Sequence, residues 1–178
     1  MDRAVTGSTR SGGTAPQGNG FGAGLPAESD NKDEWPYARP LLADPTLVPG
    51  CATMDLAEAR YAEPLRMRSP SPVFGLRTAE QVLQRVAFPL SGRAEQPGVL
   101  TMTLDSRGLG GPWRSVTVVF NATPESATQQ LTDLRGADAR LHPVLRSSAD
   151  ETLRTSSFAA DSGTFTVPAR GVAVFVQR

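Results

Sequence analysis

The chain has 178 residues, with 18 Lys or Arg and 18 Asp or Glu, so its formal net charge at pH 7 is zero. A balanced charge removes the electrostatic case for nucleic acid or an anionic membrane as a partner, because both require a concentrated basic face. A single cysteine, Cys51, and a single histidine, His142, exclude an internal disulfide and a metal cluster rich in Cys or His. We therefore predict a protein without a metal ion or cofactor, and without nucleic acid or membrane partners.

Residues 1–19 consist mainly of Gly, Ser, Thr and charged residues without periodicity, and we predict that they are disordered. They contain no apolar core of a signal peptide, so nothing in the chain directs export, and the compartment is left open. Residues 20–50 carry Gly and Pro with a few large apolar residues in no regular period. Such a segment is ordered only where something packs against it.

Helical periodicity begins after this segment and predicts a helix over 54–68. Either Thr53 or Asp55 serves as its N-cap. Pro64 lacks the N–H that would bond one turn back, so we expect a kink or an early end there. Further along, Thr78 and Gln81 form a capping box that starts a second helix of two turns at most.

From Val86 onward the hydrophobic period changes to two, which is typical of half-buried strands. Pro89 places the first strand at a sheet edge. About seven short strands separated by turn residues predict an antiparallel β-sandwich of about ninety residues, so the chain is mainly β. The predicted strands cover residues 86–90, 100–104, 116–120, 140–145, 152–158, 164–167 and 171–177.

The stretch "GNGFGAGLP" places Gly20, Gly22 and Gly24 at alternate positions. A dinucleotide fingerprint requires a strand before it and a helix after it, and a Walker loop requires a following Lys and Ser or Thr. Neither context is present, so we do not interpret these glycines as a phosphate site. Phe21 within the glycines is unusual for a linker and indicates a backbone held close to a surface.

Other candidate residues favour structural roles. The acidic segment 28–35 could supply paired carboxylates, but it has no apolar setting to separate their pKa values and is typical of a solvated turn. His142 precedes Pro143 in a predicted strand, where a lone histidine is more often structural than catalytic. Asn121 begins the sequon "NAT" and indicates a turn, and Cys51 has no basic neighbour to activate it. The inventory contains no active site.

Six blocks in order along the chain resemble the C-terminal region of pullulanase-type alpha-1,6-glucosidases, the starch-debranching members of the alpha-amylase superfamily. They are "GNGFGAGLP" (18–26), "WPYARPLLADPTLVP" (35–49), "LRMRSPSPVFGLRTAEQVLQRVAFPLSG" (65–92), "PGVLTMTLDS" (97–106), "VTVVFNATPESATQ" (116–129) and "GTFTVPARGVAVFV" (163–176). Each block alone is weak evidence for this family, whereas the six blocks together, in the same order, are specific for it.

The resemblance implies that the chain holds the end of a catalytic (β/α)₈ barrel and the β domain that follows it. Residues 20–77 then correspond to a loop and the last barrel helix, and residues 78–178 to a C-terminal β-sandwich, while residues 1–19 depart from the family pattern. By the same resemblance, we expect Asn19 and Phe21 to lie in the loop that approaches an alpha-glucan in the intact enzyme. The catalytic carboxylates of the family have no counterpart here, so we assign no catalytic residue and expect no hydrolysis by the chain alone.

Two functions remain open. The first is a C-terminal fragment of a debranching glycoside hydrolase, with the catalytic barrel as its packing partner. The second is a stand-alone carbohydrate-binding β-sandwich module, which would require an exposed aromatic platform. Trp113 is the one candidate for such a platform in the β segment, and it fits equally well as a loop anchor.

Overall fold

The computed structural model describes residue 25 and residues 27–178. The described residues divide into two compact units, of which the first ends at Asp55 and the second covers residues 56–178. The second unit contains every strand found among the described residues and is called the β unit below. The short helices of the chain are α1 (Glu28–Asn31), η2 (Lys32–Glu34), η3 (Pro45–Leu47), η4 (Pro72–Gly75), η5 (Gly92–Ala94), η6 (Thr132–Leu134), α5 (Pro143–Arg146) and η7 (Leu153–Thr155).

In the first unit, α2 (Trp35–Ala43) was not predicted from the sequence. Pro36 lies in its first turn, where a missing N–H costs nothing, because that N–H has no partner within the helix. The Arg39 guanidinium lies over the Trp35 ring, 5.1 Å from its centroid. A helix with proline in its first turn and a second proline inside it has too little apolar periodicity to be recognised by pattern.

The long helix α3 (Cys51–Arg68) confirms the predicted helix but begins earlier. The amides of Thr53 and Met54 both donate to the Gly50 carbonyl, at 3.0 and 3.1 Å, so neither Thr53 nor Asp55 is the N-cap, and that prediction was wrong. Of the two outcomes expected at Pro64, the early end was wrong, since the helix continues through Arg68, and the kink stays a prediction. Pro64 is exposed while Glu63 and Met67 are buried, so tertiary contacts hold the last turn despite the lost hydrogen bond.

Helix α4 (Ala79–Arg85) begins at the predicted capping residue. The Gln81 amide donates to the Thr78 hydroxyl at 3.2 Å. The Gln81 side chain accepts in return from the Arg77 amide at 2.9 Å, one residue before the position that a standard capping box uses. Side-chain oxygens therefore bond both the Gln81 amide in the first turn and the Arg77 amide before the helix.

Replacing Thr78 by alanine lowers the free energy of unfolding by about 1 kcal/mol, because an N-cap hydroxyl is lost from a helix of only two turns. Urea denaturation of the two proteins measures the difference. Thr78→Ser keeps the hydroxyl and is the control. Equal losses in both variants would contradict the assignment.

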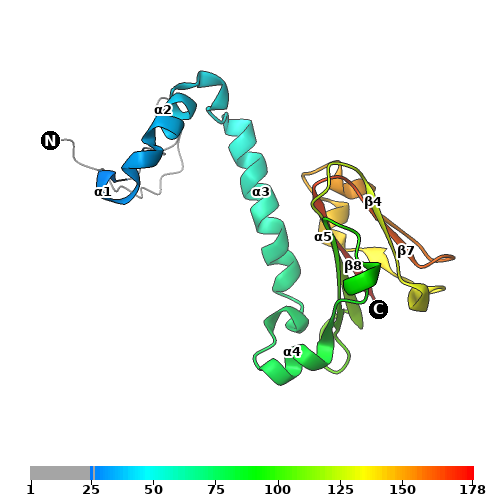
Figure 1. Ribbon diagram of the computed structural model, residues 1–178. Coiled ribbons are helices and arrows are strands. Elements are labelled where there is room, and N and C mark those ends of the chain that lie inside the picture. The colour runs from blue at the N-terminus through cyan, green and yellow to red at the C-terminus, as the bar shows by residue number, and fades with distance from the viewer. Residues whose placement is uncertain (1–24, 26) are drawn as a thin grey trace. The chain divides into compact units, whose positions relative to one another are not determined.

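The strands form two antiparallel sheets, which confirms the predicted β-sandwich (Figure 1). The five-stranded sheet has the order β1 (Val86–Ala87), β2 (Val99–Asp105), β3 (Ser115–Asn121), β8 (Gly171–Gln177) and β5 (Arg140–Leu141). The three-stranded sheet has the order β4 (Ala127–Gln130), β7 (Thr164–Val167) and β6 (Ser157–Ala159). Strand β4 was missed because its sequence, "ATQQ", has no large apolar residue.

Three predicted strands are shorter in the structure. Strand β1 lies at a sheet edge as expected, but it ends before Pro89. Strand β5 ends at Leu141 because Pro143 opens the single-turn helix α5. The predicted strand over 152–158 begins instead with the turn η7, and only its end belongs to β6.

The interior between the two sheets is built around Phe165 of β7 and Phe175 of β8, whose ring centroids lie 4.8 Å apart. The ring of Phe158 packs against that of Phe165, with the two centroids 4.6 Å apart. The turn that leads into β7 depends on Gly163, at φ 72°, where an added Cβ would lie 2.3 Å from the Leu131 carbonyl oxygen. Only glycine fits this close approach.

The opposite face of the five-stranded sheet is also apolar. Its side chains form three cross-strand rows over β2, β3 and β8: Leu104, Val116 and Val176; Met102, Val118 and Val174; and Leu100, Phe120 and Val172. The first row is buried, and Val118 and Val174 of the second are buried as well. The third, called the apolar row below, stays open, with exposed fractions of 40% for Leu100, 36% for Phe120 and 43% for Val172.

Candidate functional site

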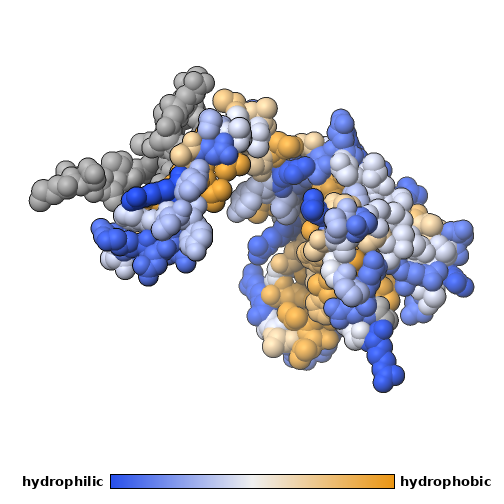
Figure 2. All heavy atoms as spheres, turned by 45° about the horizontal axis from the view of Figure 1, so that its top comes forward, coloured by the Kyte–Doolittle hydropathy of each residue, from blue (hydrophilic) through white to orange (hydrophobic). Residues whose placement is uncertain are grey.

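A groove of about 640 Å³ adjoins the apolar row. Its floor includes Phe120 and Val172, and one side is formed by the second half of α3 with Met67. The rest of its lining is mostly apolar and comes from η4, α5, η7 and the strands. Figure 2 shows that apolar side chains on the β unit gather in one area instead of being scattered singly. A contiguous exposed apolar area of this kind is typical of an interaction site.

Two carboxylates line the groove, and both already have partners. Glu63 is buried and accepts from the Ser148 hydroxyl and the Ala149 amide, each at 3.0 Å. Asp150 pairs with the Arg60 guanidinium at 2.7 Å and accepts from the Thr152 amide at 2.9 Å. A glycosidase needs one carboxyl group free to donate a proton and a second free to attack. Neither side chain is free for that chemistry.

The rim of the groove is basic. The exposed side chains of Arg68 and Arg170 both line it, and among the described residues neither guanidinium pairs with an acid. Arg170 has φ 49°, an uncommon conformation for a residue with a Cβ, and its amide donates to the Thr123 carbonyl at 3.0 Å. The turn between β7 and β8 therefore holds this arginine beside the groove at some cost in backbone strain.

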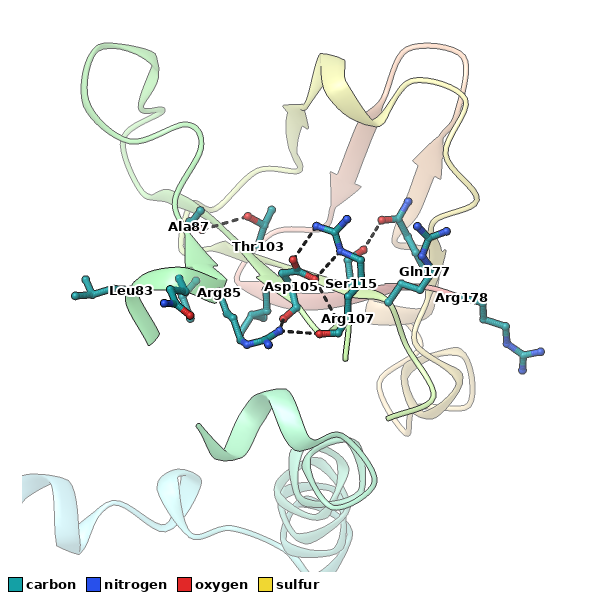
Figure 3. Close-up of a pocket in the computed structure, with 13 residues that line it drawn as sticks. Leu83, Arg85, Ala87, Thr103, Asp105, Arg107, Ser115, Gln177 and Arg178 are labelled. Carbon is teal, nitrogen blue, oxygen red and sulfur yellow. Dashed lines mark hydrogen bonds and ion pairs between the residues drawn. The ribbon is translucent and has the colours of Figure 1, made fainter. Parts of the chain in front are cut away.

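A second pocket, of about 460 Å³, lies at the end of the five-stranded sheet (Figure 3). Arg85 donates to the carbonyls of Asp105 and Arg107, at 3.1 and 2.9 Å. Arg107 forms a bidentate pair with Asp105, at 2.9 and 2.7 Å. The Arg178 side chain points away from this cluster. Because the Arg85, Asp105 and Arg107 side chains bond to the protein itself, we interpret the cluster as a polar network that closes the end of the sheet.

The bidentate pair lowers the pKa of Asp105 from its usual value near 3.8 to about 2, chiefly through the hydrogen bonds from the Arg107 side chain and amide. A lowered pKa in the folded state contributes stability that is complete above pH 4 and is lost as the pH falls from 4 toward 2. Asp105→Asn should therefore be less stable than wild type at pH 5 and approach it near pH 2. The side chain is 36% exposed, so solvent screening keeps the difference small. Urea denaturation along a pH series tests this, and a constant difference would contradict it.

Trp113 lies in the structure as a loop anchor. Its ring packs edge-on against His142, with the centroids 5.7 Å apart, and the Arg178 guanidinium lies 5.8 Å from its centroid. Its Nε1 atom is buried without a hydrogen-bond partner among the described residues. A sugar platform needs an open ring face, and this ring is partly buried against the core.

His142 has the structural role that was predicted, although it does not lie within a strand. It is the N-cap of α5, where its Nδ1 accepts from the Val144 amide at 3.2 Å. Burial lowers the pKa of the ring, and the nearby Arg146 lowers it further. The ring is therefore neutral at pH 7, as the hydrogen bond to Nδ1 requires.

The other candidates from the sequence are not brought together. Asn19 and Phe21, the predicted glucan-loop residues, lie outside the described residues. The acidic segment 28–34 forms α1 and η2 and is exposed. Cys51 is an exposed free thiol. Asn121 is buried and donates its amide N–H groups to main-chain carbonyls of the β unit, which assigns the sequon asparagine to a structural turn.

The described part of the chain has neither a cluster of metal-binding side chains nor a membrane-spanning helix. No group of three or more His, Cys, Asp or Glu side chains could hold a metal ion. None of the helices in this part is both long and apolar enough to cross a membrane.

Sequence reasoning missed the apolar row and the Glu63 contacts. The alternation in β2 and β3 was visible in the sequence, but it does not tell which residues another element covers. Ser148 lies 85 residues beyond Glu63, and a single sequence carries no signal for such a pair.

Comparison with known proteins agrees with the resemblance of the six blocks. Residues 16–178 match the family described as alpha-1,6-glucosidases, pullulanase-type, C-terminal. The chain is 34% identical over 167 residues to Pullulanase 1, chloroplastic, of Arabidopsis thaliana, and 30% identical over 163 residues to a pullulanase of Klebsiella pneumoniae. Each match covers 89% of this chain but only 17% and 15% of the relatives.

Solved structures give the same result. The crystal structure of PulA from Klebsiella oxytoca superposes with a TM-score of 0.69 at 30% identity, over 86% of this chain and 15% of that one. The maltotriose complex of PulA from Klebsiella pneumoniae superposes with a TM-score of 0.67 at 28% identity, over 86% and 17%. The sandwich, the six blocks and these matches agree: the chain belongs to the pullulanase-type alpha-1,6-glucosidase family, of which it carries the C-terminal part.

Proposed function

We propose that this chain is the non-catalytic β domain of a debranching enzyme and that it serves the enzyme by packing against the catalytic barrel. The observation that carries the proposal is the unequal coverage: 89% of this chain matches, against 17% and 15% of two pullulanases. The whole enzyme hydrolyses alpha-1,6-glucosidic bonds in pullulan, starch or glycogen. Asn19 and Phe21 approach the alpha-glucan only in that intact enzyme.

The groove supports a non-catalytic role. Retaining hydrolysis requires two carboxyl groups about 5 to 5.5 Å apart, one of them protonated. Glu63 and Asp150, the acids of the groove, are both engaged by hydrogen bonds or an ion pair. A support function requires an apolar surface, and the apolar row supplies one.

The alternative, a stand-alone carbohydrate-binding module, is less well supported. It depends on Trp113, whose ring packs against His142 and the core. Calorimetry of the chain alone with maltotriose separates the two functions. We expect no heat of binding at millimolar sugar, and a saturable signal would favour the module.

Complementation tests the support function. The pullulanase of Klebsiella pneumoniae is truncated before the segment that matches residues 16–178, and pullulan hydrolysis is measured for the truncated enzyme, for this chain, and for the mixture. We expect activity or thermal stability to rise only in the mixture. The relative's own C-terminal segment, added in the same way, is the positive control. Rescue by that segment but not by this chain would contradict the proposal.

A further inference from the structure

We infer that the apolar row and the groove beside it receive a single amphipathic helix from the upstream part of the same enzyme, and that this helix carries acidic residues on its flank. The inference rests on the proposed function and adds to it the surface, the shape and the charge of the partner. The family match is to a C-terminal part, so the remainder of such an enzyme lies upstream of this segment.

The apolar row is the uncovered part of the outer face of the five-stranded sheet. The inner face of the five-stranded sheet packs on the three-stranded sheet, and its outer face is buried at Val116, Val118, Val174 and Val176. Only Leu100, Phe120 and Val172 remain exposed among the outward side chains of β2, β3 and β8, apart from a half-buried Met102. A sheet that is apolar on both faces is normally covered on both faces. One more covering element would complete the outer layer.

The dimensions favour a helix over a strand. The three side chains lie on three adjacent strands, which at about 4.8 Å spacing span about 10 Å. That width equals the diameter of one helix, about 10 to 12 Å with side chains. A strand would instead add to a sheet edge, whereas the row lies on the face of the sheet. The second half of α3 provides a neighbour for helix-against-helix packing along the groove.

The charged residues of the groove indicate which charge the partner helix carries beside its apolar face. Four charged residues besides Glu63 line the groove: Arg60, Arg68, Asp150 and Arg170. Asp150 is paired with Arg60, and Glu63 is held by Ser148 and Ala149, which leaves Arg68 and Arg170 unpaired among the described residues. Acidic side chains on the incoming helix would neutralise both, which gives the interface a register as well as an apolar contact.

The affinity of this chain for the truncated Klebsiella pneumoniae pullulanase tests the inference. Phe120→Asp should weaken association about tenfold or more, since it places a charge at the centre of the apolar row. Leu83→Asp, at another apolar side chain that is 82% exposed, is the matched control and should leave the affinity unchanged. Circular dichroism and the thermal midpoint of each variant establish that it is folded.

The acidic flank has its own test. Arg68→Glu combined with Arg170→Glu should weaken association about tenfold and reduce its dependence on salt, while Arg93→Glu, at an exposed arginine outside the groove, should do neither. If the wild-type chain does not bind, the proposed function fails. If it binds and Phe120→Asp binds equally well, the surface is wrong. Self-association that Phe120→Asp abolishes would make a second copy the occupant and would also overturn the inference.

Discussion

Replacing Asn121 by alanine should lower the free energy of unfolding by about 4 kcal/mol, because several buried main-chain groups lose their partner at once. The side chain is 2% exposed. Its Nδ2 atom donates to the carbonyls of Glu125 at 2.8 Å and Pro168 at 2.9 Å, with Val167 further off at 3.3 Å. Its Oδ1 atom accepts from the Thr123 amide and hydroxyl, at 3.0 and 2.7 Å. One side chain thus ties the end of β3 to the connection between β7 and β8.

Chemical denaturation of Asn121→Ala and Asn121→Asp measures this effect. The aspartate keeps the shape and the Oδ1 acceptor but turns the donor into a second acceptor that faces three carbonyl oxygens, so we expect it to be at least as destabilising. Asn31→Asp, the same substitution at an exposed asparagine, should change stability by less than about 0.5 kcal/mol. Near wild-type stability of Asn121→Asp would show that the donor hydrogen bonds contribute little.

The sequence pattern predicted most accurately those strands whose ends are marked by a glycine. The strands over 164–167 and 171–177 were predicted to the residue, since each follows or begins with a glycine and alternates cleanly. The single-turn helix α5 was missed because the decisive residue is Pro143, whose fixed φ suits the first turn of a helix and also suits the end of a strand. Pro64 failed as a helix breaker for the complementary reason: buried contacts of Glu63 and Met67 outweigh the propensity.

The exposed apolar row was less predictable than the fold. Leu100 and Leu104 alternate in the same strand and look equivalent in sequence, yet Leu100 is 40% exposed and Leu104 is 5% exposed. What separates them is whether another element lies over them. Exposure of this kind depends on how distant parts of the chain meet, so the alternation predicted the strand but not which of its side chains stay exposed.

Glu63→Ala should release the second half of α3 from the rest of the β unit, at a cost of about 3 kcal/mol. The carboxylate is 4% exposed and holds the Ser148 hydroxyl and the Ala149 amide. Hydrogen bonds to a charged group contribute about 1.5 to 3 kcal/mol each, and both are lost together. Met67, the other buried side chain of this helix, and the half-exposed Arg60–Asp150 ion pair would remain, and these two contacts are too little to keep the helix ordered.

Amide hydrogen exchange separates local release from global unfolding. In Glu63→Ala, the amides of residues 56–68 should lose protection while those of β3 and β8 keep theirs. Glu58→Ala removes an exposed glutamate from the same helix and should leave the protection unchanged. Equal protection in both variants would mean that the Glu63 hydrogen bonds do not hold the helix. Because this part of α3 forms one side of the groove, its release would also remove the neighbour against which we propose the incoming helix to pack. We therefore expect Glu63→Ala to weaken association through the position of α3, without a contact between Glu63 and the partner.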